Sequence, residues 1–489
     1  MPSATRLSMC SLSTYTRLVL ARVICWSLLP VYAAPTLVAS QANNASVADL
    51  IEQARAALRG HHYEETVALY HRAMELDPRD ASVHVELGQL YEFMNQPVEA
   101  IVAFRGALDA DPQNETAELG LSDAYRQVFN RSEARRVLEG AARRHPQSAG
   151  PLMRLGEMDI ESQGYHDALK RLRQALRLSP SDATARIDLA TVYQARGQMD
   201  QELRELNLAI KQSPRAAAAF YLRASIYADR NDDAHALEDA RKVIELQPDN
   251  QRGRALLAKV DIRVHECAEA VALLEPEAER AGAETLYLLA RAYECDGQPD
   301  PARKTLAQFA ERSESEHSSQ QNKMQADYLA TRAGEMARRN QLIAALGLLN
   351  QALAKDPENG KANAQLAKIY YSQGEVSKAR EAVARALKTT PYQPDYLYVL
   401  GRVLEQQGDL PGALSTFEKT VEVDPRESDA YYEMGMAYLK TNDRARGLEA
   451  LKRAVQLAPD DADYRAALEK AEGSGKKRDE QKIKKPIGR

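Results

Sequence analysis

Two cysteines and one histidine are the residues of this 489-residue chain whose types and spacing are most suited to chemistry. Cys267 and Cys295 lie 28 positions apart, and His265 precedes the first of them by two positions. Cysteine pairs form disulfides in oxidising compartments, and thiolates together with imidazole bind zinc. Three interpretations of the pair therefore stay open: a disulfide, two packed free thiols, or a metal site that also uses His265.

Motifs of the common enzyme classes are absent from the sequence. The chain has no GxxxxGK[ST] phosphate loop, no GxGxxG after a strand, no HExxH and no GxSxG. The nine histidines are spread along the chain, and the pair His61 and His62 is expected at a solvated turn. We therefore expect no catalytic residues, no cofactor and no dedicated metal site.

The composition predicts an all-α protein. Alanine, leucine, glutamate and arginine dominate, and these residues are strong helix formers. Runs rich in valine, isoleucine and threonine, which are typical of strands, are scarce. The formal net charge is −5, so nucleic-acid binding has little electrostatic support.

The prolines reveal an internal repeat of 34 residues. Ten of the 21 prolines fall into two series, and within each series neighbours are 34 positions apart. The first series is Pro78, Pro112, Pro146, Pro180, Pro214 and Pro248, and the second is Pro357, Pro391, Pro425 and Pro459.

One unit, residues 81–114, illustrates the pattern. Apolar residues recur three or four positions apart in each half, which is helical spacing, and Asn95-Gln96-Pro97 separates the halves. Asp111-Pro112 ends the second half, because proline lacks an N–H donor and restricts the residue before it. Place eight of the unit is small in every copy, which lets the two helices approach closely. These residues are Ala54, Gly88, Ser122, Gly156, Ala190, Ala224, Ala258, Ala290, Ala333, Ala367, Gly401 and Gly435.

This pattern resembles the tetratricopeptide repeat family. The resemblance covers about residues 47–461, apart from one short gap. It implies a right-handed superhelical solenoid of antiparallel helix pairs, with a concave groove that is lined mainly by the first helix of each pair. Partner peptides or helices lie in that groove in the family.

The resemblance also indicates which residues line the groove, because place five faces it in the family. That place is tyrosine in four copies, and nearby at place nine lie the cations Arg291, Lys368 and Arg402. A tyrosine row with flanking cations suits an extended peptide, although these tyrosines could instead fill gaps between successive first helices. The candidate groove residues are Tyr221, Tyr287, Tyr398, Tyr432, Arg291, Lys368 and Arg402.

The repeats divide the chain into segments. We expect about eight units in 47–316, with a shortened unit at 251–282, and four more units in 326–461. The polar insertion 317–325 between them is interpreted as a soft joint or as a longer loop. A capping helix is expected at 462–475, since the open end of a repeat array needs a polar face, and a basic disordered tail at 476–489.

The N-terminal residues 1–42 have the order of a secretory signal. Arginines precede the apolar run from Val23 to Ala34, and small residues follow it. Twelve apolar residues are too few to cross a bilayer, but an uncleaved membrane anchor remains the alternative. If the chain is exported, Cys267 and Cys295 meet an oxidising compartment and lie at the same corner edge of neighbouring units.

About 83 residues lie outside the repeats, and most of them belong to the signal and the tail. No catalytic domain of ordinary size fits there, so we expect a non-enzymatic protein. The predicted function is a periplasmic or secreted scaffold that binds protein or peptide partners. The alternative is a membrane-tethered component of envelope assembly or secretion.

Overall fold

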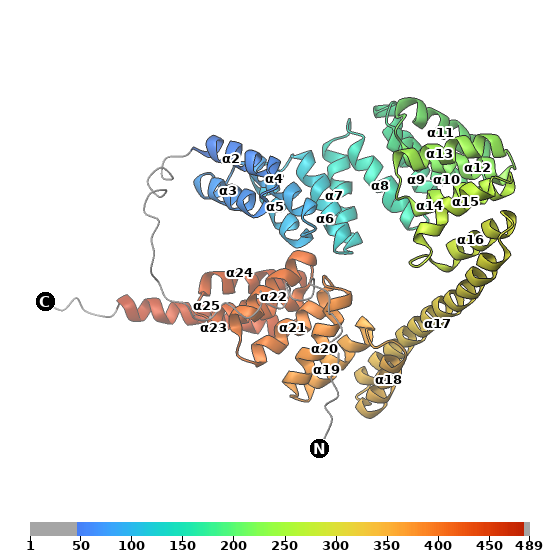
Figure 1. Cartoon of the computed structure of the whole chain (residues 1–489). Coiled ribbons are helices and arrows are strands. Elements are labelled where there is room, and N and C mark those ends of the chain that lie inside the picture. Colours follow the sequence, from blue (N-terminus) through green and yellow to red (C-terminus); the bar gives the residue numbers. More distant parts are fainter. Residues whose placement is uncertain (1–45, 484–489) are drawn as a thin grey trace, which may run out of the picture. The chain divides into compact units, whose positions relative to one another are not determined.

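The computed structural model describes residues 46–483, with side chains up to Gly473. These residues form the 24 α-helices α2–α25 and one 3-10 turn, η1, and they contain no strand (Figure 1). The all-α expectation is therefore confirmed. The chain splits into two compact units, Met1–Asp77 and Pro78–Arg489. The predicted signal or anchor, 1–42, lies outside the described residues.

Most helices form the expected pairs. The first helices are α2 (Val47–Arg59), α4 (Ala81–Phe93), α6 (Glu115–Gln127), α8 (Gly150–Glu161), α10 (Ala183–Ala195), α12 (Ala217–Asp229), α14 (Gln251–Arg263), α16 (Ala283–Cys295), α19 (Gly360–Ser372), α21 (Pro394–Gln406) and α23 (Ser428–Lys440). The second helices are α3 (Tyr63–Leu76), α5 (Pro97–Ala110), α7 (Arg131–Arg144), α9 (Tyr165–Leu178), α11 (Met199–Gln212), α13 (Asp233–Leu246), α15 (Cys267–Leu274), α18 (Leu342–Lys355), α20 (Val376–Thr389), α22 (Leu410–Val423) and α24 (Arg444–Leu457). Three elements depart from this scheme: η1 (Glu275–Glu277), α17 (Pro299–Arg338) and α25 (Ala462–Ile483).

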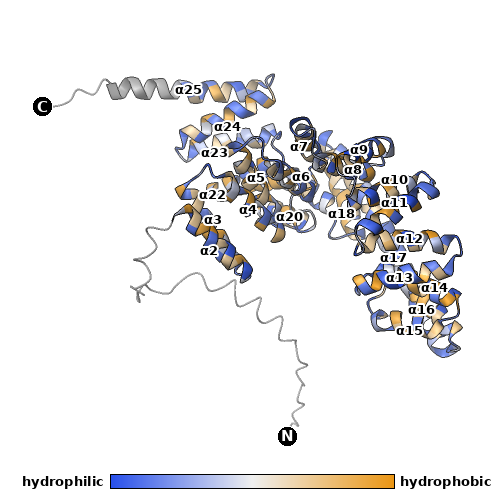
Figure 2. Cartoon of the chain, turned by 90° about the horizontal axis from the view of Figure 1, so that it is seen from above, coloured by the Kyte–Doolittle hydropathy of each residue, from blue (hydrophilic) through white to orange (hydrophobic). Residues whose placement is uncertain are grey.

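Side-chain caps start many of the first helices. Asp80, Asn114, Asp182 and Asn250 each precede such a helix, and their side chains accept hydrogen bonds from backbone N–H groups of its first turn. These bonds satisfy donors that have no partner inside the helix. Hydrophilic and hydrophobic residues are mixed along each helix (Figure 2), and the apolar ones recur three or four positions apart, so that each helix has an apolar side for its neighbours.

The corner between the two helices of each copy needs a left-handed residue. Place fifteen has a positive φ in all twelve copies, and glycine or asparagine occupies it in eight of them. The four other residues at this place are His61, Phe129, Gln163 and His265. A left-handed conformation costs such residues roughly 1–2 kcal/mol, so these corners carry backbone strain.

Small residues at place eight let large side chains fill the space between the helices. A Cβ added to Gly88 would lie 2.6 Å from the ring of Phe104, which is fully buried. Alanine at this place is likewise fully buried in Ala190, Ala258 and Ala367. Close approach of the two helices therefore depends on this place, as the repeat pattern predicts.

The insertion 317–325 is neither a loop nor a visible joint. It lies inside α17, a continuous 40-residue helix that joins the second helix of the eighth copy to the first helix of the ninth. The insertion contains no glycine or proline, and each residue added to an existing helix gains one backbone hydrogen bond. Helix propagation therefore replaces the break that we expected at this point.

Two other segments also differ from the pattern. The shortened unit 251–282 has a second helix of only eight residues, α15, which continues into η1. The last helix, α25, begins at Ala462 as expected but runs to Ile483. We expected it to end at residue 475, so the start of the predicted disordered tail is wrong. Residues 476–483 contain no proline, and most of them are good helix formers.

No helix between residues 46 and 483 has both the length and the apolar character that a membrane span requires.

Candidate partner-binding groove

Three of the predicted groove residues lie in one pocket. This Arg402 pocket has a volume of about 340 Å³ and lies among the first helices α19, α21 and α23. Lys368 comes from α19, and Tyr398 and Arg402 come from α21. The complete lining is Lys368, Tyr371, Asp395, Tyr398, Val399, Arg402, Glu427 and Asp429.

Arg402 organises the pocket. Its Nη1 donates a hydrogen bond to the hydroxyl of Tyr398 over 3.0 Å and lies 2.6 Å from a carboxylate oxygen of Glu433. The guanidinium carbon also lies 5.3 Å from the ring centre of Tyr371, within the range of a cation–π contact. The arginine is therefore part of the pocket wall and is paired within the chain, whereas the sequence indicated only a cation that flanks the tyrosine row.

The environment shifts the pKa values of the pocket groups. Burial raises the pKa of the Tyr398 hydroxyl to about 12, so this side chain is neutral and can donate a hydrogen bond at neutral pH. Burial alone would lower the pKa of Arg402, but its ion pair with Glu433 raises that pKa above the usual value. Burial, followed by the nearby Asp429 and Asp395, raises the pKa of Glu427.

The rim of the pocket is more open. Lys368 lies 3.3 Å from Asp395, and their side chains are 39% and 60% exposed. The lining holds two cations, Lys368 and Arg402, against three carboxylates, so its summed charge is −1. Aromatic faces, a neutral hydroxyl and paired charges together offer both apolar contact and hydrogen bonding.

Tyr432 does not extend this pocket. Its ring stacks on that of Tyr464 in α25, with centroids 4.9 Å apart. The hydroxyl of Tyr464 in turn donates to the carboxylate of Asp429. For this tyrosine the observed contacts match the gap-filling interpretation, because it packs under the last helix.

The three remaining candidates lie on α12 and α16. Tyr221 is half-buried, and its carbonyl oxygen accepts a hydrogen bond from Ser225. Tyr287 is 41% exposed and packs against Phe309 with centroids 5.5 Å apart. Arg291 is exposed on the same helix as Tyr287. The structure therefore brings together the candidates of repeats ten and eleven and leaves those of repeats six and eight outside the pocket.

A second polar cluster was missed by the sequence analysis. On α6 and α8, Arg126 lies 3.0 Å from Glu157, and Arg154 lies 2.8 Å from Asp123. Phe129 is 75% exposed and lines the same cavity, which has a volume of about 580 Å³. Asp123 and Glu157 occupy place nine of their copies, so the acidic residues at this place could have indicated the cluster. Only the cations at place nine were singled out from the sequence.

Asp188 on α10 lies near this cluster. Its Oδ2 atom is buried and has no hydrogen-bond partner in the structure. Burial, together with the nearby charges of Glu157 and Asp182, raises the pKa of this carboxyl to about 7. Close to neutral pH, the group therefore changes between its charged and uncharged forms.

The cysteine pair lies where the repeat geometry suggests. The structure joins Cys267, at the start of α15, to Cys295, at the end of α16, with Cα atoms 5.6 Å apart. This separation is typical of a disulfide. His265 completes a group of three ligand atoms that lie within 4.8 Å of one another. The disulfide and the metal interpretations therefore share one set of atoms.

Profiles of the tetratricopeptide repeat match much of the chain. One matches residues 94–152, 160–226, 337–403 and 404–471, and others match 51–115, 217–250 and 284–314. Cellulose synthase operon protein C of Pseudomonas fluorescens is 37% identical over 105 residues. That stretch is 21% of this chain and 8% of the relative, so the chain matches only a small part of that protein.

Solved structures with similar folds include other repeat proteins. A tetratricopeptide repeat protein from Parabacteroides merdae is 20% identical, with a TM-score of 0.41, over 50% of this chain and 98% of that one. YrrB, which is described as a repeat protein with an unusual peptide-binding site, is 26% identical with a TM-score of 0.30. That match covers 38% of this chain and 95% of YrrB.

Proposed function

Since this chain belongs to the tetratricopeptide repeat family, we propose that it is an exported scaffold that binds a peptide or helix of a partner protein in the Arg402 pocket. The observation that carries the proposal is the meeting of Lys368, Tyr398 and Arg402 in one cavity. Tyrosine and arginine contribute strongly to protein interfaces, because they combine contact area with hydrogen bonds. The repeats themselves are then the functional part, and we expect no enzymatic activity.

Preorganisation of the pocket supports this role. Arg402 is held by Tyr398 and Glu433 of its own chain, so a partner does not have to order this long side chain. Ordering such a side chain on binding costs roughly 0.5–1.5 kcal/mol. Lys368 and Asp395 stay accessible at the rim, where they can contact polar groups of a bound peptide.

Export is proposed on separate grounds. The basic and apolar order of residues 1–42 is that of a secretory signal. A relative of part of the chain is encoded with a cellulose synthase, as its name states, which favours a role in the cell envelope. If residues 1–42 are not cleaved, the same protein is a membrane-tethered envelope component. N-terminal sequencing of the purified chain separates the two: a start near Ala34 or Asn43 excludes the tether.

A pull-down with matched variants tests the pocket. Crosslinking of the full chain in a native envelope fraction, followed by mass spectrometry, first identifies the partners. Tyr398→Ala and Lys368→Ala are expected to reduce recovery of a groove partner at least tenfold, which corresponds to about 1.4 kcal/mol. Tyr287→Ala is the control, because Tyr287 occupies the same place five outside the pocket. Equal recovery with all three variants would contradict the proposed site.

A further inference from the structure

Val423 is buried at a place of the repeat that is otherwise open. It is the last residue of α22 and has no exposed surface. Its apolar counterparts in other copies, Leu178, Leu246 and Leu457, are only half-buried. Polar residues at this place, such as Gln212 and Lys355, are exposed. The repeat itself therefore does not bury this place, and another part of the chain covers Val423.

Arg105 on α5 shows the same kind of exception. Its side chain is 29% exposed, whereas the residues at place twenty-five are exposed in every other copy except the third, where Glu139 is half-buried. Arg105 donates a hydrogen bond to the hydroxyl of Tyr125 in the next copy. Arg173, the matching arginine two copies later, donates in the same way to the hydroxyl of Tyr193 over 3.0 Å. Arg173 is nevertheless exposed. The additional burial of Arg105 therefore comes from a part of the chain that is not a neighbouring repeat.

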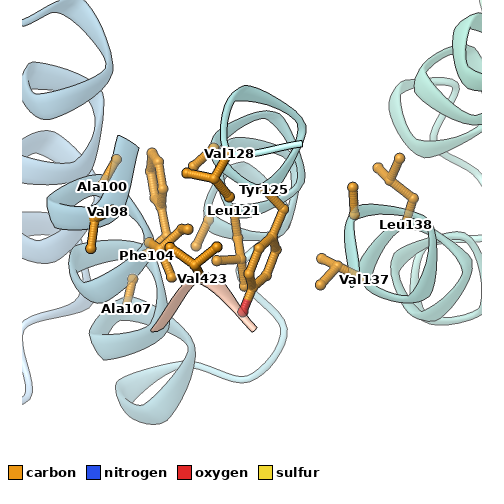
Figure 3. Packing of buried hydrophobic residues seen from close by; sticks show 14 of the residues in the cluster. Val98, Ala100, Phe104, Ala107, Leu121, Tyr125, Val128, Val137, Leu138 and Val423 are labelled. Atoms are coloured by element: carbon orange, nitrogen blue, oxygen red, sulfur yellow. The ribbon is translucent and has the colours of Figure 1, made fainter. Parts of the chain in front are cut away.

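Arg105 and Val423 are buried by the same contact, which joins α5–α7 to the end of α22. Arg105 forms an ion pair with Glu422, and the side-chain amide of Asn130 donates to the backbone carbonyl of Val423 over 2.7 Å. Figure 3 shows Val423 beside Phe104 and Tyr125, in one cluster of buried apolar residues. Residues separated by about 300 positions in sequence thus form both polar and apolar contacts.

In the Arg105–Glu422 ion pair, the cost of burying the two charges opposes their attraction. Burial lowers the pKa of Arg105, but Glu422 raises it above the usual value. Burial raises the pKa of Glu422, and Arg105 only partly reverses this shift. Desolvation thus offsets much of the attraction, as is common for partly buried ion pairs. The apolar burial of Val423 stabilises the contact, and the ion pair selects its register.

We propose that the face of α5–α7 that carries Arg105 and Asn130 is a docking surface for the chain's own eleventh repeat, the α21–α22 pair. The C-terminal repeats then attach to repeats two and three of the same molecule. Docking also builds a cavity of about 880 Å³, with Val98, Glu99 and Val102 on the α5 side. The facing wall includes Tyr431, Met434 and Tyr438 of α23.

Zero-length crosslinking of the full chain tests this contact. Arg105→Lys places an amine beside the carboxylate of Glu422, and carbodiimide then joins the two in an amide that mass spectrometry identifies. The wild-type chain has no amine at this position and gives no such product. Arg173→Lys is the matched control, because the same place in repeat four faces no distant carboxylate. We expect the 105–422 product only with Arg105→Lys.

A charge exchange and isotope mixing complete the test. Arg105→Glu alone gives no product, as in the wild type, and Arg105→Glu with Glu422→Lys gives the 105–422 product with the charges exchanged. Crosslinking a mixture of ¹⁵N-labelled and unlabelled chains distinguishes docking within one molecule from docking between two. Absence of the product in a folded Arg105→Lys chain, or a product found only between labelled and unlabelled chains, would overturn the proposal. Circular dichroism of each variant shows that it is folded.

Discussion

Tyr398 and Arg402 lie one turn apart on α21, and Nη1 of the arginine donates to the phenolic oxygen over 3.0 Å. The same nitrogen lies 2.6 Å from Glu433 on the next first helix. Lysine has no planar fork with which to keep both contacts and the stacking on Tyr371. The arginine therefore connects α21 to α23 in the next repeat and also forms part of one wall of the pocket.

Arg402→Lys is accordingly expected to lower stability by about 1 kcal/mol, which is typical for a lost partly buried hydrogen bond. Thermal unfolding followed by circular dichroism measures the change. Arg291→Lys is the matched control, since Arg291 occupies the same place nine and is exposed. A change at that position should stay within about 0.5 kcal/mol. Equal melting temperatures for the two variants would show that the contacts of Arg402 contribute nothing to stability.

Gly88→Ala tests the close approach of the helices at place eight. The new methyl group would lie 2.6 Å from the buried ring of Phe104, so the packing has to shift. We expect a loss of about 1–3 kcal/mol, as in other overpacked cores. Gly347→Ala is the control, because a Cβ at this exposed position of α18 meets nothing within 4 Å. That variant should gain up to about 1 kcal/mol from helix propensity, and urea unfolding compares both with the parent.

The sequence predicted the regular part of the fold well, because each unit repeats the same local signals. The spacing of Pro78 and Pro112, and the small residue at place eight, placed the helix pairs and their packing. The two failures have different causes. α17 passes through residues 317–325 because that segment contains no glycine or proline, whereas α25 continues through the glycines at 473 and 475, a break signal that did not end the helix.

The candidate site was only partly predictable for a different reason. Repeat phase predicted that Tyr398 and Arg402 lie on the same side of the repeats, and both line the Arg402 pocket, since their place in the unit fixes the direction of the side chain. It did not show that Tyr432 packs under Tyr464, because the terminal helix lies outside the repeat. Contacts between distant copies, such as that of Val423, also cannot be read from a pattern that relates each unit only to its neighbours.

Phe129→Asn is expected to stabilise the protein. Phe129 has a φ of 61° and is 75% exposed, so it carries the strain of a left-handed residue without the benefit of burial. Asparagine tolerates this conformation and already occupies the same corner in Asn95 and Asn231. We expect a gain of about 1 kcal/mol in the free energy of unfolding. A loss of stability would instead mean that the phenyl ring makes contacts that outweigh the backbone strain.

Asp188→Asn is expected to stabilise the protein at alkaline pH and to lose this advantage in acid. The folded state holds the pKa of Asp188 at about 7, well above its usual value of 3.8. Protonation therefore favours the folded state, and this contribution is present below about pH 4 and lost as the pH rises through about 7. At pH 8 the asparagine variant should melt roughly 2–4 °C higher than the parent. The difference should shrink towards pH 5.

Other carboxyls titrate in the same range, so the comparison with the parent is essential. Burial also raises the pKa of Glu92 and Glu202 to about 7 each. Both remain in the variant, and their contribution cancels in the difference between the two melting curves. A difference that does not vary between pH 5 and pH 8 would show that Asp188 has an ordinary pKa.

The pairing of Cys267 and Cys295 is open to direct chemical test. A disulfide that closes this loop should contribute roughly 3–4 kcal/mol by restricting the unfolded chain. In a chain with Cys10→Ser and Cys25→Ser, we expect no reactive thiol after unfolding without reductant. Reduction should lower the melting temperature, and a variant that also carries Cys267→Ser and Cys295→Ser should melt at the lower temperature with or without reductant.

The alternatives give different results in the same experiment. Two reactive thiols without bound metal would establish free cysteines. Two thiols that become reactive only after chelation, together with one equivalent of zinc, would establish the metal site with His265. In that case His265→Ala should weaken zinc binding, whereas the disulfide is insensitive to it because the imidazole takes no part in the sulfur–sulfur bond. Melting of the reduced and oxidised chains, measured with and without chelator, therefore assigns this corner of repeats seven and eight.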